Sequence, residues 1–91
     1  MTYELDFKEK AISDIAFLKK NEPQVFNKLV KLLDELREHP YSGTGKPELL
    51  KYKLSGQWSR RITHHHRLMY EVHEGKVTVV ILSALGHYSA K

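Results

Sequence analysis

The spacing of the apolar residues changes sharply at Pro40, and this change limits the possible folds more than any other feature of the chain. After a short alternating segment (residues 3–7), apolar residues recur every three or four positions up to residue 38, and alternation returns beyond Pro40. The first spacing is typical of helices and the second of half-buried strands. The order predicts one α+β domain, residues 1–91: an N-terminal strand and an antiparallel helical hairpin on a twisted, mainly antiparallel sheet of four to five strands.

The helical part divides into two predicted helices, because Asn21-Glu22-Pro23 interrupts the pattern. The first is predicted at residues 8–20. The second runs from Pro23, which suits a first helical turn, to about residue 38, where His39-Pro40 ends it. Each helix carries one apolar stripe that we expect to lie in the core: Ala11, Ile12, Ile15, Ala16 and Leu18 in the first, and Phe26, Leu29, Val30, Leu33 and Leu36 in the second.

Four strands are predicted beyond Pro40, near residues 50–54, 58–63, 67–72 and 77–85. Neighbouring strands must place their apolar residues on the same face, and pairing Ile62 with Leu68 achieves this. The same register sets Trp58 opposite Val72 and leaves residues 64–66 as the loop. It also turns four side chains to the face away from the helices: Arg61, Thr63, Arg67 and Met69.

The same register places Arg60 opposite Tyr70 on the helix side of the sheet. Beyond a predicted turn at Glu74-Gly75, it pairs Tyr70 with Val79 and Val72 with Val77. The core is therefore expected to receive three residues of the last strand: Val77, Val79 and Ile81.

Positive charge is concentrated in residues 41–70, which we call the basic segment. Elsewhere the chain holds 9 of its 15 Lys and Arg residues against 10 of its 11 Asp and Glu residues, so the net charge of +4 arises in this segment. A local cationic field of this kind favours a polyanionic partner. The segment contains a single carboxylate, Glu48, and six basic residues: Lys46, Lys51, Lys53, Arg60, Arg61 and Arg67.

Composition excludes several other kinds of protein. The chain has no cysteine, and so no thiol nucleophile, disulfide or thiolate metal site. Its first residues lack the features of a signal peptide, and no apolar run approaches about 18 residues. We therefore expect a cytoplasmic protein that does not enter a membrane. The contiguous run His64-His65-His66 is not expected to bind a metal, because adjacent side chains in a tight loop diverge.

The basic segment and the C-terminus together contain the groups needed to cleave RNA without a metal or another cofactor. Such cleavage requires a base for the 2′-OH proton, an acid for the departing 5′-oxygen and cations around the phosphate. The candidates are Glu48 as the base, His87 as the acid, and Arg61 and Arg67 as the fixed charges. Lys46, Lys51 and Lys53 would steer and hold the RNA backbone, and Tyr88 could stack on a base or pack the last strand against a helix.

Each of these assignments has a simpler alternative. Glu48 could be a surface carboxylate balancing Lys46 or Lys51, and Arg61 and Arg67 could be ordinary exposed sheet residues. At the level of function, the alternative is a non-catalytic basic module that binds RNA or an acidic partner.

Four segments of the chain form a specific pattern: Gly45-Lys46-Pro47-Glu48-Leu49-Leu50-Lys51, Leu54-Ser55-Gly56-Gln57-Trp58-Ser59-Arg60-Arg61-Ile62-Thr63, His66-Arg67-Leu68-Met69-Tyr70 and the terminal His87-Tyr88. Together they resemble the Txe/YoeB toxins of the RelE/ParE superfamily. The resemblance implies the RelE-like fold and a type II toxin that cleaves mRNA in the ribosomal A site. It also implies a YefM/Phd-type antitoxin as partner, binding of operator DNA through the toxin–antitoxin complex, and a possible homodimer. Within the same superfamily, the alternative is a toxin directed at DNA gyrase.

The resemblance also assigns roles to individual residues. Glu48 stands where the family has its proposed general base, His87 where it has its proposed general acid, and Arg67 where an arginine stabilises the transition state. Further residues match positions that line the same site: Lys51, Arg61 and Tyr88. Strict alternation from Leu82 would turn His87 towards the core, so its role requires a bend, which Gly86 could permit.

Overall fold

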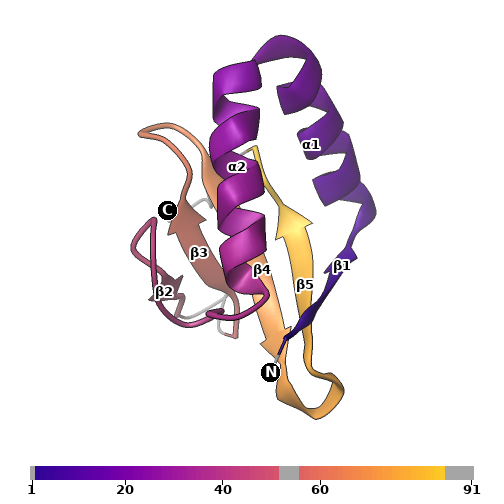
Figure 1. The fold of residues 1–91 in the computed structure, drawn as a ribbon, viewed down its shortest axis with the longest axis vertical. Coiled ribbons are helices and arrows are strands. Elements are labelled where there is room, and N and C mark those ends of the chain that lie inside the picture. Colours follow the sequence, from indigo (N-terminus) through magenta and orange to yellow (C-terminus); the bar gives the residue numbers. More distant parts are fainter. Residues whose placement is uncertain (1, 52–55, 86–91) are drawn as a thin grey trace.

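The computed structural model describes residues 2–51 and 56–85, and Figure 1 shows two helices packed on one face of a five-stranded sheet. This architecture confirms the predicted α+β fold. The elements in chain order are β1 (Glu4–Phe7), α1 (Glu9–Asn21), α2 (Pro23–Leu36), β2 (Glu48–Leu49), β3 (Trp58–Arg61), β4 (Arg67–His73), the 3₁₀ helix η2 (Glu74–Lys76) and β5 (Thr78–Ser83).

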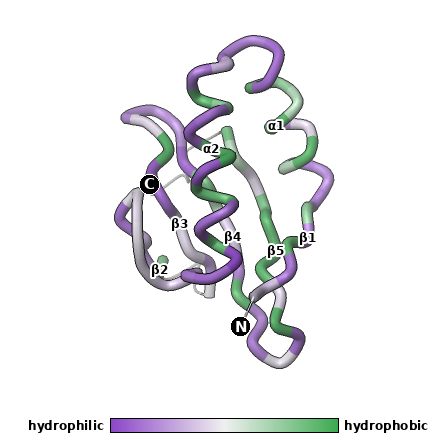
Figure 2. The backbone as a smooth tube through the Cα atoms, viewed as in Figure 1, coloured by the Kyte–Doolittle hydropathy of each residue, from purple (hydrophilic) through white to green (hydrophobic). Residues whose placement is uncertain are grey.

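The strand order is β1-β5-β4-β3-β2, in which β1 runs parallel to β5 and every other pair is antiparallel. β5 therefore lies between two strands and is buried over three successive residues, Val79, Val80 and Ile81. Figure 2 shows the corresponding hydrophobic colouring along β5. Within the described residues, neither helix is long and apolar enough to cross a membrane.

The helix predictions were right about position and partly wrong about the buried faces. Pro23 occupies the first turn of α2, and the amide of Glu22 closes α1 by donating to the carbonyl oxygen of Leu18 at 2.8 Å. However, the side chains of Ile12 and Val30 are 57% and 44% exposed. Ala16 is exposed as well, and α2 ends at Leu36 instead of residue 38.

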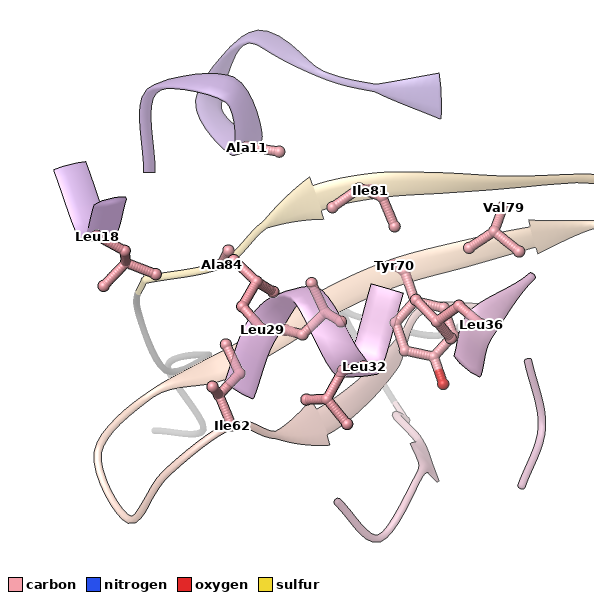
Figure 3. Close-up of a cluster of buried hydrophobic side chains, with 11 residues drawn as sticks. Ala11, Leu18, Leu29, Leu32, Leu36, Ile62, Tyr70, Val79, Ile81 and Ala84 are labelled. Carbon is pink, nitrogen blue, oxygen red and sulfur yellow. The ribbon is translucent and has the colours of Figure 1, made fainter. Parts of the chain in front are cut away.

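Fewer residues of each helix are fully buried than predicted, although Ile15, Phe26 and Leu33 pack against the core as half-buried side chains. Asp14 takes a buried position on α1 that the sequence pattern had left out, and Leu32 does so on α2. Figure 3 shows Leu36 of α2 next to Tyr70 of β4, whereas Ala11 of α1 lies on the side of Ile81 in β5. The buried cluster consists of Ala11, Leu18, Leu29, Leu32, Leu36, Ile62, Leu68, Tyr70, Val79, Ile81 and Ala84.

The predicted pairing of β3 with β4 was wrong by two residues. Trp58 lies opposite Tyr70, Arg60 opposite Leu68 and Arg61 opposite Arg67. A shift of two leaves every side chain on its predicted face, because side chains in a strand alternate with a period of two. The loop therefore spans residues 62–66 instead of 64–66.

Local hydrogen bonds explain the longer loop. Thr63 Oγ1 lies 2.6 Å from His66 Nδ1 and accepts a hydrogen bond from the amide of His65 at 3.2 Å. The amides of Ile62 and Thr63 both donate to the carbonyl oxygen of His66. These bonds close the loop between Ile62 and His66, which lie next to the last pair of the observed register, Arg61 and Arg67.

The pairing of β4 with β5 is also shifted by two residues, with Val72 opposite Val79 and Tyr70 opposite Ile81. The cause is Val77, which adopts a left-handed conformation (φ 49°) at the end of η2 and so precedes the strand. Val77 is half-buried and outside the core cluster, contrary to prediction. Of the strand predicted at residues 50–54, Leu50 and Lys51 are not in a strand, and residues 52–54 lie outside the described part of the chain; the short strand β2 is Glu48–Leu49 instead.

Candidate catalytic face of the sheet

Arg60 on β3 is fully buried and fixes the segment that joins α2 to β2. Its Nη2 donates to the carbonyl oxygens of Ser42, at 2.7 Å, and of His39. Its Nη1 donates to the carbonyl oxygen of Thr44 at 3.3 Å. One guanidinium thus satisfies three backbone carbonyls that no helix or strand pairs, which holds residues 39–44 in one conformation.

Glu35 near the end of α2 supplies the negative charge next to this guanidinium. Its Oε1 lies 2.6 Å from Nη1 of Arg60, and its carboxylate accepts hydrogen bonds from the amide and hydroxyl of Thr44 at 2.7 and 2.9 Å. Burial by itself would raise the pKa of the Glu35 carboxyl, but these hydrogen bonds and the charge of Arg60 hold this pKa below its ordinary value. Tyr70 completes the network, since its hydroxyl accepts from Arg60 Nε at 3.1 Å and donates to the carbonyl oxygen of Pro40 at 2.9 Å.

Gly45 connects this fixed segment to the other face of the sheet. Its φ of 86° is in the left-handed region, and a Cβ there would lie 2.6 Å from the carbonyl oxygen of Arg61. The carbonyl oxygen of Gly45 accepts a hydrogen bond from the amide of Arg61 at 2.7 Å. The chain is therefore tied to the end of β3 directly before Lys46, from which it enters β2.

The face of the sheet away from the helices, which we call the open face, brings the candidate base and two arginines together. Glu48 on β2 is exposed and lies opposite Ser59 on β3. Arg61 lies two residues further along β3, on the same face, and is paired with Arg67 of β4. Diagonal neighbours such as Glu48 and Arg61 are about 7–8 Å apart at their backbones, within reach of long side chains.

The prediction that Arg61 and Arg67 share the open face is confirmed, and the two residues lie directly opposite one another. Arg61 is exposed, whereas Arg67 is half-buried. The exposed side chains of Lys46 and Lys51 flank β2 on either side of Glu48. The remaining predicted site residues, Lys53, His87 and Tyr88, lie outside the described residues.

The far end of the open face has a different charge pattern. A hollow over β1, β4 and β5 is lined by the carboxylates of Glu4, Asp6 and Glu71 and by the ammonium groups of Lys8 and Lys76. Charges of both signs alternate there, while around β2 and β3 the basic groups surround one carboxylate. The sheet therefore carries its cationic field at one end only.

The loop that carries His64, His65 and His66 contacts the helical hairpin. His66 Nε2 lies 3.4 Å from a carboxylate oxygen of Glu22, at the junction of α1 and α2, and the rings of His64 and His65 meet edge to face. Within residues 2–51 and 56–85, no three His, Cys, Asp or Glu side chains come together in a way that could hold a metal ion.

Two features of this site had no signal in the sequence. Glu35 lies on α2, 25 residues before Arg60, so its ion pair with Arg60 depends on the packing of α2. Ser59 is fully buried in the row of the sheet that holds Glu48, and a lone serine in a strand gives no indication of this.

Comparisons with known proteins agree with this architecture. Residues 7–88 match the family model described as a YoeB-like toxin of the bacterial type II toxin-antitoxin system. Toxin YoeB of Escherichia coli (strain K12) is 37% identical over 84 residues, covering 92% of this chain and 98% of that protein. Toxin RelK of Mycobacterium tuberculosis is 38% identical over 84 residues, covering 92% and 96%.

Solved structures give the same result. A YoeB/ParE toxin from Agrobacterium tumefaciens superposes with a TM-score of 0.86 at 31% identity and covers 93% of this chain and 99% of its own. The YoeB dimer from Staphylococcus aureus has a TM-score of 0.83 at 35% identity and covers 97% and 100%. The same Staphylococcus aureus toxin is also known in a heterotetrameric complex with YefM.

The fold, the cationic open face and these matches define a toxin of the bacterial type II toxin–antitoxin class, in the RelE/ParE superfamily. The match over most of the chain is specific within that class. The chain belongs to the YoeB-like toxin family, which confirms the resemblance seen in the sequence.

Proposed function

We propose that this protein is a ribosome-dependent endoribonuclease that cleaves mRNA in the ribosomal A site, in the cytoplasm and without a metal or another cofactor. One observation carries the proposal: Glu48, the one carboxylate of the basic segment, is exposed on the same face as the paired arginines Arg61 and Arg67. A base next to fixed cations is the arrangement that attack by a ribose 2′-OH on its own phosphate requires.

In the proposed reaction Glu48 accepts the proton of the 2′-OH. The 2′-oxygen then forms a bond to the adjacent phosphorus, and the bond from phosphorus to the 5′-oxygen breaks. His87 gives a proton to the departing 5′-oxygen, a role that it takes from the family resemblance. The products are one fragment that ends in a 2′,3′-cyclic phosphate and one that begins with a 5′-hydroxyl.

The two arginines serve the charge that develops on the phosphate. A planar guanidinium can hold two phosphate oxygens at once, and fixed cations stabilise a transition state more strongly than mobile ones do. Lys46 and Lys51, exposed beside β2, would bind the flanking phosphates together with Lys53. Tyr88 would stack on a base.

The cationic open face also suggests how the activity is controlled. By analogy with the YoeB–YefM complex of Staphylococcus aureus, we propose a YefM/Phd-type antitoxin whose acidic C-terminal tail covers the basic segment. The pair would bind operator DNA only as a complex, and the free toxin would form a homodimer. Size measurements of the toxin alone, and DNA binding with and without the antitoxin, test these points.

Toeprinting of a translated mRNA on purified ribosomes tests the proposed reaction. The wild-type toxin should cut in the A site, and Glu48→Gln should cut about 10²–10⁴ times more slowly, the usual contribution of one acid–base group. Glu4→Gln is the matched control, because Glu4 is an exposed carboxylate at the far end of the same face.

Two results would contradict the proposal. The first is a wild-type toxin that makes no cut in the A site. The second is cleavage at the wild-type rate by both Glu48→Gln and His87→Ala. Binding of free RNA with a steep salt dependence and without cut ends would indicate a binding module instead, and loss of DNA supercoiling with purified gyrase would indicate a gyrase-directed toxin.

A further inference from the structure

Ser59 carries a buried hydroxyl that no part of the fold explains. The residue is 0% exposed, and among the described residues its Oγ is the one buried side-chain polar atom without a hydrogen-bond partner. A buried hydroxyl without a partner destabilises a fold, and native proteins retain few of them. Its presence on β3 therefore calls for a role outside the free protein's own stability.

The position of Ser59 identifies the group that its hydroxyl can meet. Ser59 has a directly opposite residue on each neighbouring strand. On β4 this is Met69, which is buried and apolar, and on β2 it is Glu48. Residues in such opposite positions have Cβ atoms about 4.5–5.5 Å apart. A glutamate side chain that turns down onto the sheet from this distance brings its carboxylate within hydrogen-bond reach of the serine hydroxyl.

The chemistry of the two groups is complementary. A hydroxyl has one proton to donate, and an ionised carboxylate can only accept. The buried environment of Ser59 strengthens such a bond. A bond from Ser59 to one carboxylate oxygen would leave the other free to receive a proton from a substrate, while Ser59 keeps its own proton.

We infer that Ser59 is a positioning residue for Glu48: when RNA fills the open face, its hydroxyl donates to the Glu48 carboxylate and fixes it in the orientation that accepts the 2′-OH proton. The inference rests on the proposed function. It assigns Ser59 no direct contact with RNA. An ionised carboxylate is the form that accepts this hydrogen bond, so its loss should show in the pH dependence of cleavage as well as in the rate.

Ser59→Ala separates this role from a packing role, because the two predict different outcomes. Alanine removes an unpaired buried hydroxyl, so the unfolding midpoint should stay the same or rise. The single-turnover cleavage rate on ribosomes should nevertheless fall about tenfold or more, the effect of losing one hydrogen bond to a charged group. The acidic limb of the rate–pH profile should move to higher pH.

Ser59→Thr is the matched variant, because threonine keeps the hydroxyl and suits a strand. It should restore most of the rate and return the acidic limb to its wild-type position. Unchanged cleavage and an unchanged pH profile in Ser59→Ala would overturn the inference. So would a loss of rate that accompanies a lower unfolding midpoint and leaves the acidic limb in place, since that pattern is what a structural residue produces.

The two proposals fail in distinguishable ways. If the wild-type protein makes no A-site cut, the ribonuclease proposal fails and the role of Ser59 fails with it. If the wild type cuts, Glu48→Gln does not, and Ser59→Ala matches the wild type in rate and pH profile, only the inference about Ser59 is wrong.

Discussion

Arg60 and Arg61 are adjacent in the sequence and lie in opposite environments. Arg60 points to the helix side, is fully buried and binds Glu35, Tyr70 and three backbone carbonyls. Arg61 points to the open face, where it is exposed opposite Arg67. Two identical side chains one residue apart thus differ completely in what surrounds them.

This difference shows how a buried residue can hold the segment next to a surface site in one conformation. The buried arginine fixes residues 39–44, and Gly45 then ties the chain to Arg61 just before Glu48. The exposed arginine remains available for an anion. The predictions below test this division between a structural and a functional arginine, starting with the largest expected effect.

Replacing Arg60 should lower the free energy of unfolding more than any other single change on β3. Arg60→Met removes the cation next to the Glu35 carboxylate and the donor to three backbone carbonyls, and breaking a buried ion pair in this way costs about 3–5 kcal/mol. The control, Arg61→Met, should change the free energy of unfolding by less than about 0.5 kcal/mol. Chemical denaturation measures both. Equal stabilities of the two variants would disprove the division.

Replacing Arg67 should reduce activity while the protein stays folded. If its charge acts on the transition state, Arg67→Ala should slow A-site cleavage by about 10²–10³-fold, as the loss of one preorganised donor does elsewhere. Arg37→Ala is the control, because Arg37 is exposed and lies outside the basic segment. Circular dichroism would confirm that the fold is retained, and wild-type cleavage by Arg67→Ala would exclude the role.

The ion pair between Glu35 and Arg60 should contribute less to the stability of the fold in acid. Because the pKa of Glu35 is lowered in the fold, its stabilising contribution is complete above the ordinary value of 4.5 and is lost as the pH falls through the lower pKa of the folded state. Glu35→Gln should therefore be less stable than the wild type near neutral pH, and the gap should narrow in acid. Denaturation at a series of pH values measures this gap, and a gap that widened in acid would be the wrong sign.

The smallest effect is expected at Tyr41, on the surface of the fixed segment. Burial, the hydrogen bond that it donates to Glu74 and the charge of that carboxylate raise its pKa to about 12. Because the pKa of Tyr41 is higher in the fold than its ordinary value of 10.0, its protonated hydroxyl stabilises the fold at pH values below 10.0. This contribution is lost as the pH rises towards 12. Glu74→Gln should lower this pKa in a tyrosinate absorbance titration, whereas Glu71→Gln should not.

The periodicity of the apolar residues and the distribution of charge predicted much of the fold and of the candidate site. Alternation alone turned Arg60 and Arg61 to opposite faces, and this assignment survived a pairing error of two residues. The prediction failed where a residue's environment depends on distant parts of the chain: Ile12 and Val30 fitted helical stripes but lie beyond the width of the sheet contact. Both predicted strand registers were wrong by two residues next to local features that periodicity does not encode: the hydrogen bonds of Thr63 and the left-handed conformation of Val77.

By itself, the sequence determined the α+β class, the face on which each side chain of β3 and β4 lies, and the concentration of cationic charge around Glu48. These follow from local properties, the alternation of a strand and the order of charges. Only the tertiary structure decided that β1 pairs in parallel with β5, that Glu35 is the partner of Arg60, and that Ser59 is buried opposite Glu48. Those outcomes depend on which distant segments come into contact, and packing in three dimensions sets that choice.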